Sequence, residues 1–550
     1  MMVLRERSRR LRLLLVWLGI LQLGAALAAE KSFRERIEDR FELYRSSGQL
    51  RAAGDAIVEK RLVLKLYESN GLLPLWRDKA NVAAVMSWID RSYREGLDPA
   101  DYHRDALTRP DLNEVDRELL LTDALVTLAI HLASGKVDPA RLFRTWNYTP
   151  ALADSLTAAT LLAAIQHGAV ATYLEGKLPE GIYRDLRAAL ARYREIRQNG
   201  GWPVIPAGTS LVLGARNPRV ALLRRRLRAS GDLTEQNPAD PELFDLPLEQ
   251  AVRRFQARHL LETDGVVGPR TLAALNVTVE RRIAQIRVNL ERLRWLYHSL
   301  PAEYVGVDLA GFELHVWKGR SLVLSSPIQV GRPFWQTPVF RDVITYIEIN
   351  PTWTVPRRIA RRELVPRLLK DPPGFLAKHN MELLTLDGRV VDPAAVDWTS
   401  IDAGNFPFVL RQRPGPNNAL GWIKFMFPNP YHVYLHDTPS KALFRRPRRA
   451  FSHGCIRVAK PLELAEILLA PNGPAWTRER IQALIDSGRT RTIVLKRPMP
   501  ILIIYLTAAP DLQAPQIVEF RPDLYHRDAK VLRALNSAPR EKAPHLQIVN

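Results

Sequence analysis

The chain has 550 residues, of which 46% are hydrophobic and 25% are charged, and its formal net charge is +21. Because hydrophobic cores rarely grow beyond about 300 residues, this length excludes a single core, and two to four domains are expected. The composition is that of a globular protein and excludes a disordered or fibrous one. The excess of positive charge favours a polyanionic partner but does not identify that partner.

The first residues predict an export signal. Five arginines between Arg5 and Arg12 precede an apolar run from Leu13 to Leu27, and Ala26-Leu27-Ala28 has the small-x-small pattern of a cleavage site. The run is short for a bilayer crossing, which takes about 20 residues. We therefore expect residues 1–28 to be a signal peptide. The alternative is an uncleaved N-terminal anchor, which would be the only contact with a membrane.

The next part of the chain has a helical pattern. Leucines and alanines recur at helical spacing between Leu119 and Leu132, and Gly135 stands where a helix would end. Glycines and prolines between Asn199 and Gly208 then indicate a linker. We predict a helical domain over residues 31–200.

A small second unit is expected over residues 210–280. It contains AVRRFQ (Ala251–Gln256), the glycine turn DGVVGPRT (Asp264–Thr271) and LAALN (Leu272–Asn276), with Pro269 at the first position of a third helix. This order of helix, turn and helix resembles the peptidoglycan-binding three-helix module of cell-wall enzymes. The alternative is a small helical bundle without that function.

The pattern changes after a basic helix expected around Arg281 to Leu296. Short runs rich in β-branched and aromatic residues predict a β-rich domain over residues 303–498. A polar, proline-rich and partly helical stretch, about 356–420, interrupts it, and residues 499–550 are expected to add a strand and a tail that pack on it. The fold class is thus multidomain α+β. The predicted strands are Tyr304–Leu309, Phe312–Trp317, Leu322–Val330, Val343–Ile349, Trp422–Phe427, His432–His436, Thr492–Leu495 and Ile501–Tyr505.

The chain has one cysteine, Cys455. Lone cysteines are most often small buried apolar side chains, but a free thiol in an exported protein is exposed to oxidation. The thiolate is the nucleophilic form, and a nearby imidazole can take the proton and form a thiolate–imidazolium pair. His453 is too close in sequence to face the thiol on a tight turn. We therefore expect His436 to be the base, brought alongside by a hairpin-like return through the basic loop Arg445–Arg449.

The residues around the thiol suit acyl transfer. Gly454 allows a sharp turn, and the amides of His453, Gly454 and Cys455 are expected to be free to stabilise an oxyanion. Arg457 can hold a substrate carboxylate through two hydrogen bonds. The basic loop is either a solvated loop or a contact for anionic glycan. No metal-ligand spacing or phosphate-binding glycine loop is present, and no pattern of aromatic and basic residues indicates nucleic acid.

The segment from Ser452 to Arg457, read with the upstream His436, resembles the active-site signature of the L,D-transpeptidase catalytic family. The resemblance implies that Cys455 is the nucleophile and His436 the general base. It also implies that Arg457, Tyr434 and Ser452 contact substrate, although Tyr434 could equally be a core residue. The third member of the triad would be the backbone carbonyl of Asp437 rather than its side chain.

Motifs outside the signature, among them Gly331-Arg332-Pro333, Gln336-Thr337-Pro338 and Gly96-Leu97-Asp98, resemble the large Gram-negative members. This implies a helical scaffold domain, a wall-binding module and a catalytic domain with an inserted lid. It further implies periplasmic location, 3→3 cross-linking of tetrapeptide stems without a cofactor or metal, and inhibition by carbapenem β-lactams. The alternatives are an L,D-carboxypeptidase, a lipoprotein-anchoring transpeptidase and a wall-binding scaffold protein without catalysis.

Overall fold

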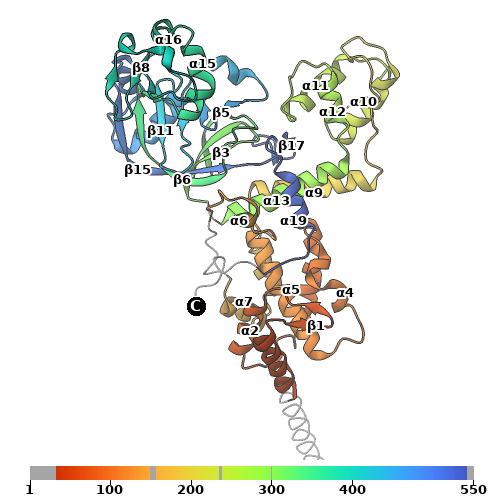
Figure 1. The fold of residues 1–550 in the computed structure, drawn as a ribbon. Helices are drawn as coiled ribbons and strands as arrows, with labels where there is room; N and C mark the ends of the chain where they lie inside the picture. The colour runs from red at the N-terminus through yellow and green to blue at the C-terminus, as the bar shows by residue number, and fades with distance from the viewer. Residues whose placement is uncertain (1–31, 149–155, 235–237, 299, 542–550) are drawn as a thin grey trace, which may run out of the picture.

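The computed structural model describes residues 32–148, 156–234, 238–298 and 300–541. The expected signal peptide, residues 1–28, lies outside these ranges. No helix in them is long and apolar enough to cross a membrane. Figure 1 shows a helical domain at the bottom, with a β-rich domain and a small helical module above it on opposite sides. The predicted fold class, multidomain α+β, is confirmed.

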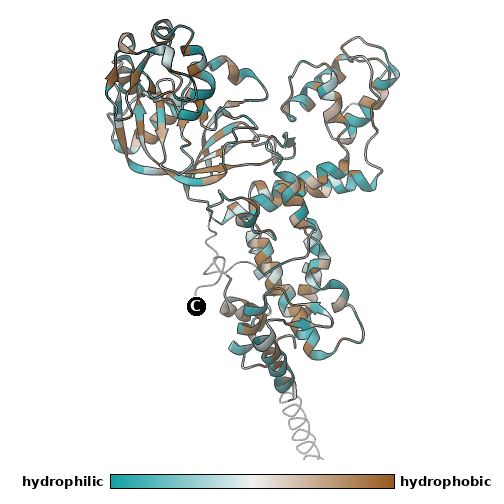
Figure 2. Cartoon of the chain, viewed as in Figure 1, coloured by the Kyte–Doolittle hydropathy of each residue, from teal (hydrophilic) through white to brown (hydrophobic). Residues whose placement is uncertain are grey.

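The helical domain is built around α5 (Glu114–Ser134). Nearly every side chain of this helix is buried, including polar ones such as Glu118 and Asp123, as expected of a central helix. Figure 2 shows how hydrophobic residues concentrate along it. The helix ends at Gly135, whose φ is +81° and whose missing Cβ leaves room for Glu291 and Trp295. The other elements are residues 32–47, β1 (Arg51–Ala52), β2 (Asp55–Ala56), α2 (Lys60–Ser69), α3 (Lys79–Arg91), η1 (Ser92–Glu95), η2 (Pro99–Tyr102), α4 (Arg104–Leu107), α6 (Pro139–Leu142), α7 (Ala158–Gln166), α8 (Val170–Glu175) and α9 (Ile182–Gln198).

The small module contains α10 (Pro218–Ala229), α11 (Leu246–Ala257) and α12 (Pro269–Leu275), packed on a core of their own. Pro269 is the first residue of α12, as the sequence predicts. The long helix α13 (Val279–Tyr297) follows and packs against both α9 and α5. It thereby joins the module, the helical domain and the β-rich domain.

The β-rich domain is a nine-stranded sheet with the order β13-β5-β14-β12-β11-β6-β15-β3-β4, and a further pairing of β4 with β5 closes eight of these strands into a ring. Helices α17 (Pro461–Leu469) and α18 (Arg478–Asp486) complete its core. The strands are β3 (Glu303–Asp308), β4 (Glu313–Lys318), β5 (Ser321–Gly331), β6 (Phe340–Ile349), β11 (Ile423–Met426), β12 (Leu435–His436), β13 (Ala450–Ser452), β14 (Ile456–Val458) and β15 (Arg491–Ile504), with η6 (Lys441–Arg445) and η7 (Ala470–Asn472) between them.

Two strand predictions differ from the structure. The predicted strand from His432 to His436 is reduced to its last two residues, because His432 has a φ of +55° and turns the chain. The two predicted strands at 492–495 and 501–505 form one long strand, β15, whose pairing with β6 shifts register between Val494 and Met499. A β-bulge of this kind interrupts the alternation of side chains and looks like a break in the sequence.

The stretch that interrupts the domain forms a separate unit, here called the insert. Its four-stranded sheet has the order β7-β10-β8-β9, and it has its own apolar core. It leaves the domain after β6 and returns before β11. Its elements are β7 (Trp353–Thr354), α14 (Arg357–Ile359), the π-helical turn η3 (Ala360–Leu364), α15 (Val365–Leu368), α16 (Pro372–Lys378), β8 (Met381–Leu384), β9 (Val390–Val391), η4 (Pro393–Ala395), η5 (Trp398–Ser400) and β10 (Val409–Gln412).

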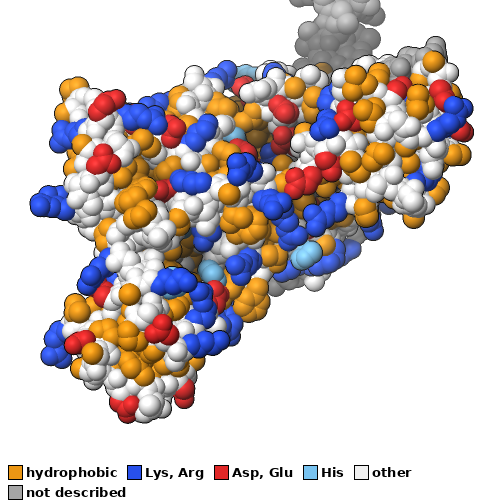
Figure 3. All heavy atoms as spheres, turned by 90° about the horizontal axis from the view of Figure 1, so that it is seen from above, with side chains coloured by type: hydrophobic (Ala, Val, Ile, Leu, Met, Phe, Trp, Pro, Cys, Tyr) orange, Lys and Arg blue, Asp and Glu red, His pale blue; other side chains and the backbone are white. Residues whose placement is uncertain are grey.

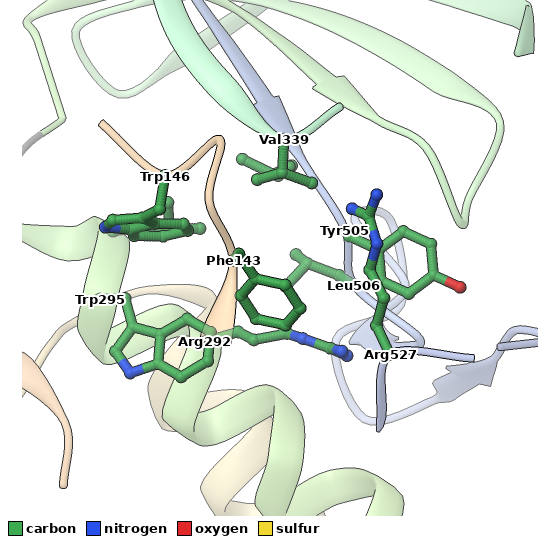
Figure 4. A pocket seen from close by; sticks show the side chains of 10 residues that line it. Phe143, Trp146, Arg292, Trp295, Val339, Tyr505, Leu506 and Arg527 are labelled. Carbon is green, nitrogen blue, oxygen red and sulfur yellow. The ribbon is translucent and has the colours of Figure 1, made fainter. Parts of the chain in front are cut away.

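The helical and β-rich domains meet at an aromatic junction around Phe143, Trp146 and Trp295, shown in Figure 4. A cavity of about 20 Å³ remains there, which is room for one water molecule. Beside it the Tyr148 hydroxyl is within hydrogen-bonding distance of the carbonyls of Phe340 (3.1 Å) and Ile503 (2.9 Å). The last part of the chain adds β16 (Ala508–Pro510), β17 (Val518–Phe520) and α19 (Asp528–Leu535), and α19 packs on α13.

Candidate active site

The strands β12 and β14 place the predicted site residues. They pair in parallel, with Leu435 opposite Ile456 and His436 opposite Arg457. Leu435 and Ile456 are buried in the core. Side chains alternate along a strand, so Tyr434, His436, Cys455 and Arg457 lie together on the opposite face. The return from His436 to the thiol is not the expected hairpin, because the strands are parallel and the chain crosses over through β13.

The turn before the thiol is held by two hydroxyl groups. Ser452 Oγ donates to the Cys455 carbonyl (2.5 Å) and accepts from the Gly454 amide (3.1 Å). Thr337 Oγ1 donates to the Gly454 carbonyl (2.8 Å) and accepts from the Gly331 amide (3.0 Å). Gly454 has a φ of +122°, which other residues rarely adopt.

These contacts correct two expectations. Ser452 is buried and bonded within the turn, so it positions the loop and does not face substrate. The Gly454 amide is taken up by Ser452 Oγ and is not free for an oxyanion. Elsewhere in the described turn, the amides of His453 and Cys455 form no turn or loop hydrogen bond, and they remain the candidate oxyanion donors.

His436 is oriented by a backbone carbonyl. Its Nδ1 lies 2.5 Å from the carbonyl oxygen of Asp437. A carbonyl only accepts, so Nδ1 carries the proton and Nε2 is left as the basic atom. Burial lowers the pKa of His436 to about 3, helped by the charges of Arg457 and Lys424 and opposed by hydrogen bonding to the backbone of Asp437 and Leu420. The Asp437 side chain instead pairs with Lys441 and accepts from the Trp422 amide.

The Cys455 thiol is partly accessible and is also held in its neutral form. Its Sγ donates to the His432 carbonyl at 3.6 Å. Burial raises the pKa of Cys455, although hydrogen bonding to Tyr434 and the charges of Lys424 and Arg457 oppose this. Burial thus shifts both pKa values in the direction that favours a neutral thiol and a neutral imidazole, whereas the sequence suggested a thiolate–imidazolium pair.

The positive charges beside the thiol are half-buried. Arg457 Nη1 donates to Gln329 (3.1 Å), while its Nε is buried and has no hydrogen-bond partner among the described residues. Burial lowers the pKa of Arg457, and the neighbouring Cys455 opposes this. Lys424 pairs with Glu348 (3.1 Å), and its ammonium lies 4.6 Å from the centre of the Tyr434 ring. An anionic substrate group near the Arg457 guanidinium would offset its charge.

The insert contacts the catalytic turn directly. His453 Nε2 lies 2.6 Å from Glu363 Oε1 in the π-helical turn η3. Next to this pair, the Arg358 guanidinium lies 4.1 Å from the centre of the Trp335 ring, and Trp335 meets His453 edge-on. Phe334 beside them is 71% exposed. The insert is therefore placed to cover the site, and a few polar contacts keep it next to the catalytic turn.

Behind the site, a cleft of about 590 Å³ opens where the insert returns to the domain. Its walls include Asp437, Trp422 and Lys441, and it is bounded by Pro414–Pro416 and by α17 and α18. No group of three His, Cys, Asp or Glu side chains in the described ranges is arranged to hold a metal ion.

Several of these residues were not singled out as site residues from the sequence. Thr337 lies in a motif that the family resemblance used, but its bond to the catalytic turn joins residues 117 positions apart. Lys424 gave a weak signal as a lone cation in the apolar strand β11. Glu363 gave none, because its partner is 90 residues away.

The comparisons with known proteins follow the domain organisation. Residues 302–494 match the family described as "L,D-transpeptidase catalytic domain", residues 61–190 match "Scaffold domain", and residues 216–275 match "Putative peptidoglycan binding domain". A "Putative L,D-transpeptidase" from Haemophilus influenzae is 36% identical over 255 residues, which are 46% of this chain and 50% of that protein. The match thus spans about half the length of this curated relative.

Two solved structures are also similar. The L,D-transpeptidase (residues 123–326) from Xylanimonas cellulosilytica is 18% identical, with a TM-score of 0.17, over 54% of this chain and 99% of that chain. The L,D-transpeptidase from Stackebrandtia nassauensis is 12% identical, with a TM-score of 0.21, over 55% and 96%.

Residues 302–494 are thus similar to the L,D-transpeptidase catalytic domain, and the chain before them is similar to a scaffold domain and to a peptidoglycan-binding domain.

Proposed function

We propose that the protein is a peptidoglycan L,D-transpeptidase that forms 3→3 cross-links through a thioester on Cys455. The observation that carries this proposal is the shared face of Cys455 and His436, with Nδ1 of the imidazole fixed by the Asp437 carbonyl. We further propose that residues 1–28 direct the protein to the periplasm.

In the first half-reaction, the sulfur attacks the carbonyl of the third stem residue while its proton passes to His436 Nε2. The oxyanion accepts hydrogen bonds from the amides of His453 and Cys455. The C–N bond to the terminal D-Ala then breaks, and the imidazolium returns the proton to the leaving amine. Because burial lowers the pKa of His436 and raises that of Cys455, we expect the proton transfer to accompany the attack.

In the second half-reaction, the side-chain amine of a third residue on a neighbouring stem attacks the thioester. His436 takes a proton from that amine and delivers it to the departing sulfur, which restores the thiol. The Arg457 guanidinium, next to the thiol on the same face, is the group that would bind a stem carboxylate. A β-lactam of the carbapenem type would acylate the same sulfur.

The test is incubation of the purified protein with disaccharide tetrapeptides, followed by mass spectrometry. Dimers that have lost one D-Ala support the proposal, whereas tripeptide monomers alone indicate a carboxypeptidase. Cys455→Ala should abolish both products, and His436→Gln should lower the rate by about 10²–10⁴-fold, the usual contribution of general-base catalysis. His167→Gln, at an exposed histidine in the scaffold domain, is the matched control. A Cys455→Ala protein that still forms dimers would refute the proposal.

A further inference from the structure

A second cleft lies between the small helical module and the β-rich domain. Its volume is about 470 Å³. The module contributes the end of α11, the glycine turn and the start of α12, and the β-rich domain contributes the basic loop that leads into β13. Six of the residues that line it are Leu261, Gly268, Arg270, Arg446, Arg448 and Phe451. Two motifs that the sequence singled out separately, the glycine turn and the arginine run, therefore face each other.

The charges in the cleft leave two arginines without a carboxylate partner. Glu262 and Arg446 form an exposed ion pair at 3.7 Å across the cleft. Asp264 also lines the cleft and is exposed, and its Oδ1 accepts from Gln256 (2.7 Å) and from the Val266 amide (2.9 Å) within the module. Arg270 and Arg448 are exposed, one on each wall, and no ion pair in the described part of the chain includes either. Seen from above, in Figure 3, Lys and Arg side chains gather along the middle of the molecule.

The cleft lies close to the nucleophile along the chain. Phe451 lines it and precedes Cys455 by four residues, so their Cα atoms are at most about 14 Å apart. Arg332 connects the two places: its Nε donates to the Phe451 carbonyl (3.1 Å), and its amide donates to the Ser452 carbonyl (3.0 Å). Three extended residues of a stem peptide span about 10 Å. A stem whose glycan lay in the cleft could thus bring its third residue to the sulfur.

We propose that this cleft is a binding subsite for the anionic glycopeptide strand whose stem is being processed. The inference rests on the proposed function and deepens it, because it assigns the module a direct part in substrate binding. Arg270 and Arg448 bind carboxylates of the strand from opposite walls, and the apolar surface of Leu261 and Phe451 packs against the sugars. Nucleic acid fits less well, because Phe451 is the only aromatic side chain that lines the cleft in the described residues, and single strands bind through several stacked aromatics.

The test compares two charge-reversal proteins that change the net charge equally. Arg270→Glu with Arg448→Glu removes the pair in the cleft, and Arg184→Glu with Arg320→Glu changes two highly exposed arginines elsewhere. Binding to purified wall polymer and the rates on polymer and on a tetrapeptide stem without sugars are measured for both. We expect the cleft variant to lose about tenfold in polymer affinity, less at high salt, and to show a higher KM for the polymer. The rate on the sugar-free stem and the melting temperature should stay unchanged.

The two proposals fail in different ways. If wild-type protein forms no thioester product, the proposed function is wrong, and polymer binding still tests the cleft. If catalysis is normal but the cleft variant binds polymer as the control does, the cleft is not a subsite. An equal loss in both variants would show a non-specific effect of net charge and would also overturn the inference.

Discussion

The pKa of His436 leads to a prediction about the resting state of the nucleophile. Burial and two neighbouring cations move this pKa from 6.5 to about 3. At about 1.4 kcal/mol per pKa unit, the site favours the neutral ring by roughly 5 kcal/mol. Burial also raises the pKa of Cys455. A thiolate–imidazolium pair is therefore disfavoured until substrate binds.

Thiol alkylation measures this state directly, because Cys455 is the only cysteine in the chain. The alkylation rate of the free protein by iodoacetamide should rise steadily above pH 8, with no plateau between pH 5 and 8. His436→Gln should leave this profile nearly unchanged, since the neutral imidazole contributes little to the thiol pKa. A plateau with a midpoint below pH 7 that disappears in His436→Gln would refute the reasoning, because it would reveal a preformed ion pair.

The lowered pKa of His436 also makes the folding stability decrease at acidic pH. An unfolded chain protonates His436 near pH 6.5, but the folded domain does so only near pH 3. Between these values the unfolded state binds more protons, so stability falls as the pH falls from 6.5 toward 3. The melting temperature of His436→Gln should depend less on pH in this window than that of the wild type.

Three further outcomes are expected. Ser452→Ala leaves the Cys455 carbonyl and the Gly454 amide without their hydrogen bonds, at a cost of about 1–3 kcal/mol in the catalytic turn. We therefore expect kcat to fall roughly 10–100-fold, and an unchanged kcat would contradict the positioning role of Ser452. Glu363→Gln weakens the partly exposed pair with His453, which is worth under about 1 kcal/mol, so KM should rise up to about fivefold. Proteolysis of the insert should become faster in this variant, while the rate of thiol alkylation should stay the same. Burial opposes the charge of His103, but two aspartates outweigh it and raise its pKa. The resulting stabilisation is full below pH 6.5 and is lost as the pH rises through the raised value, so the difference in melting temperature between the wild type and His103→Asn should narrow as the pH rises above 6.5.

The sequence predicted those parts of the fold that depend on local patterns. The periodicity of α5, the glycine turn before α12 and the hairpin strands β3 to β5 are all local signals, and the structure contains each of them. The motif around Cys455, read with His436, also picked out a thiol and an imidazole that the structure places on one face. The parallel pairing of β12 with β14 left no local trace, since it depends on a crossover that closes the sheet.

The roles of the turn residues were harder to predict for a physical reason. A serine near a nucleophile can form hydrogen bonds either with substrate or with the backbone, and the sequence does not distinguish the two. The structure shows the backbone contact, because the Cys455 carbonyl lies within hydrogen-bonding distance of Ser452 Oγ. The resting charge state was missed because it depends on burial, which a motif does not reveal. Contacts such as Glu363 with His453 arise only when the insert folds back over the domain.

The docking of Tyr148 on β6 and β15 has a consequence for how the protein folds. The hydroxyl reaches carbonyls on two neighbouring strands, and Thr145 and Asn147 also bond to the residues around β6. The final helix, α19, then packs on α13 from the far end of the sequence. The junction between the domains is therefore complete only once β15 and α19 have been synthesised. A fragment cut out at residues 303–498 would expose apolar surface that the rest of the chain covers, and we expect it to aggregate.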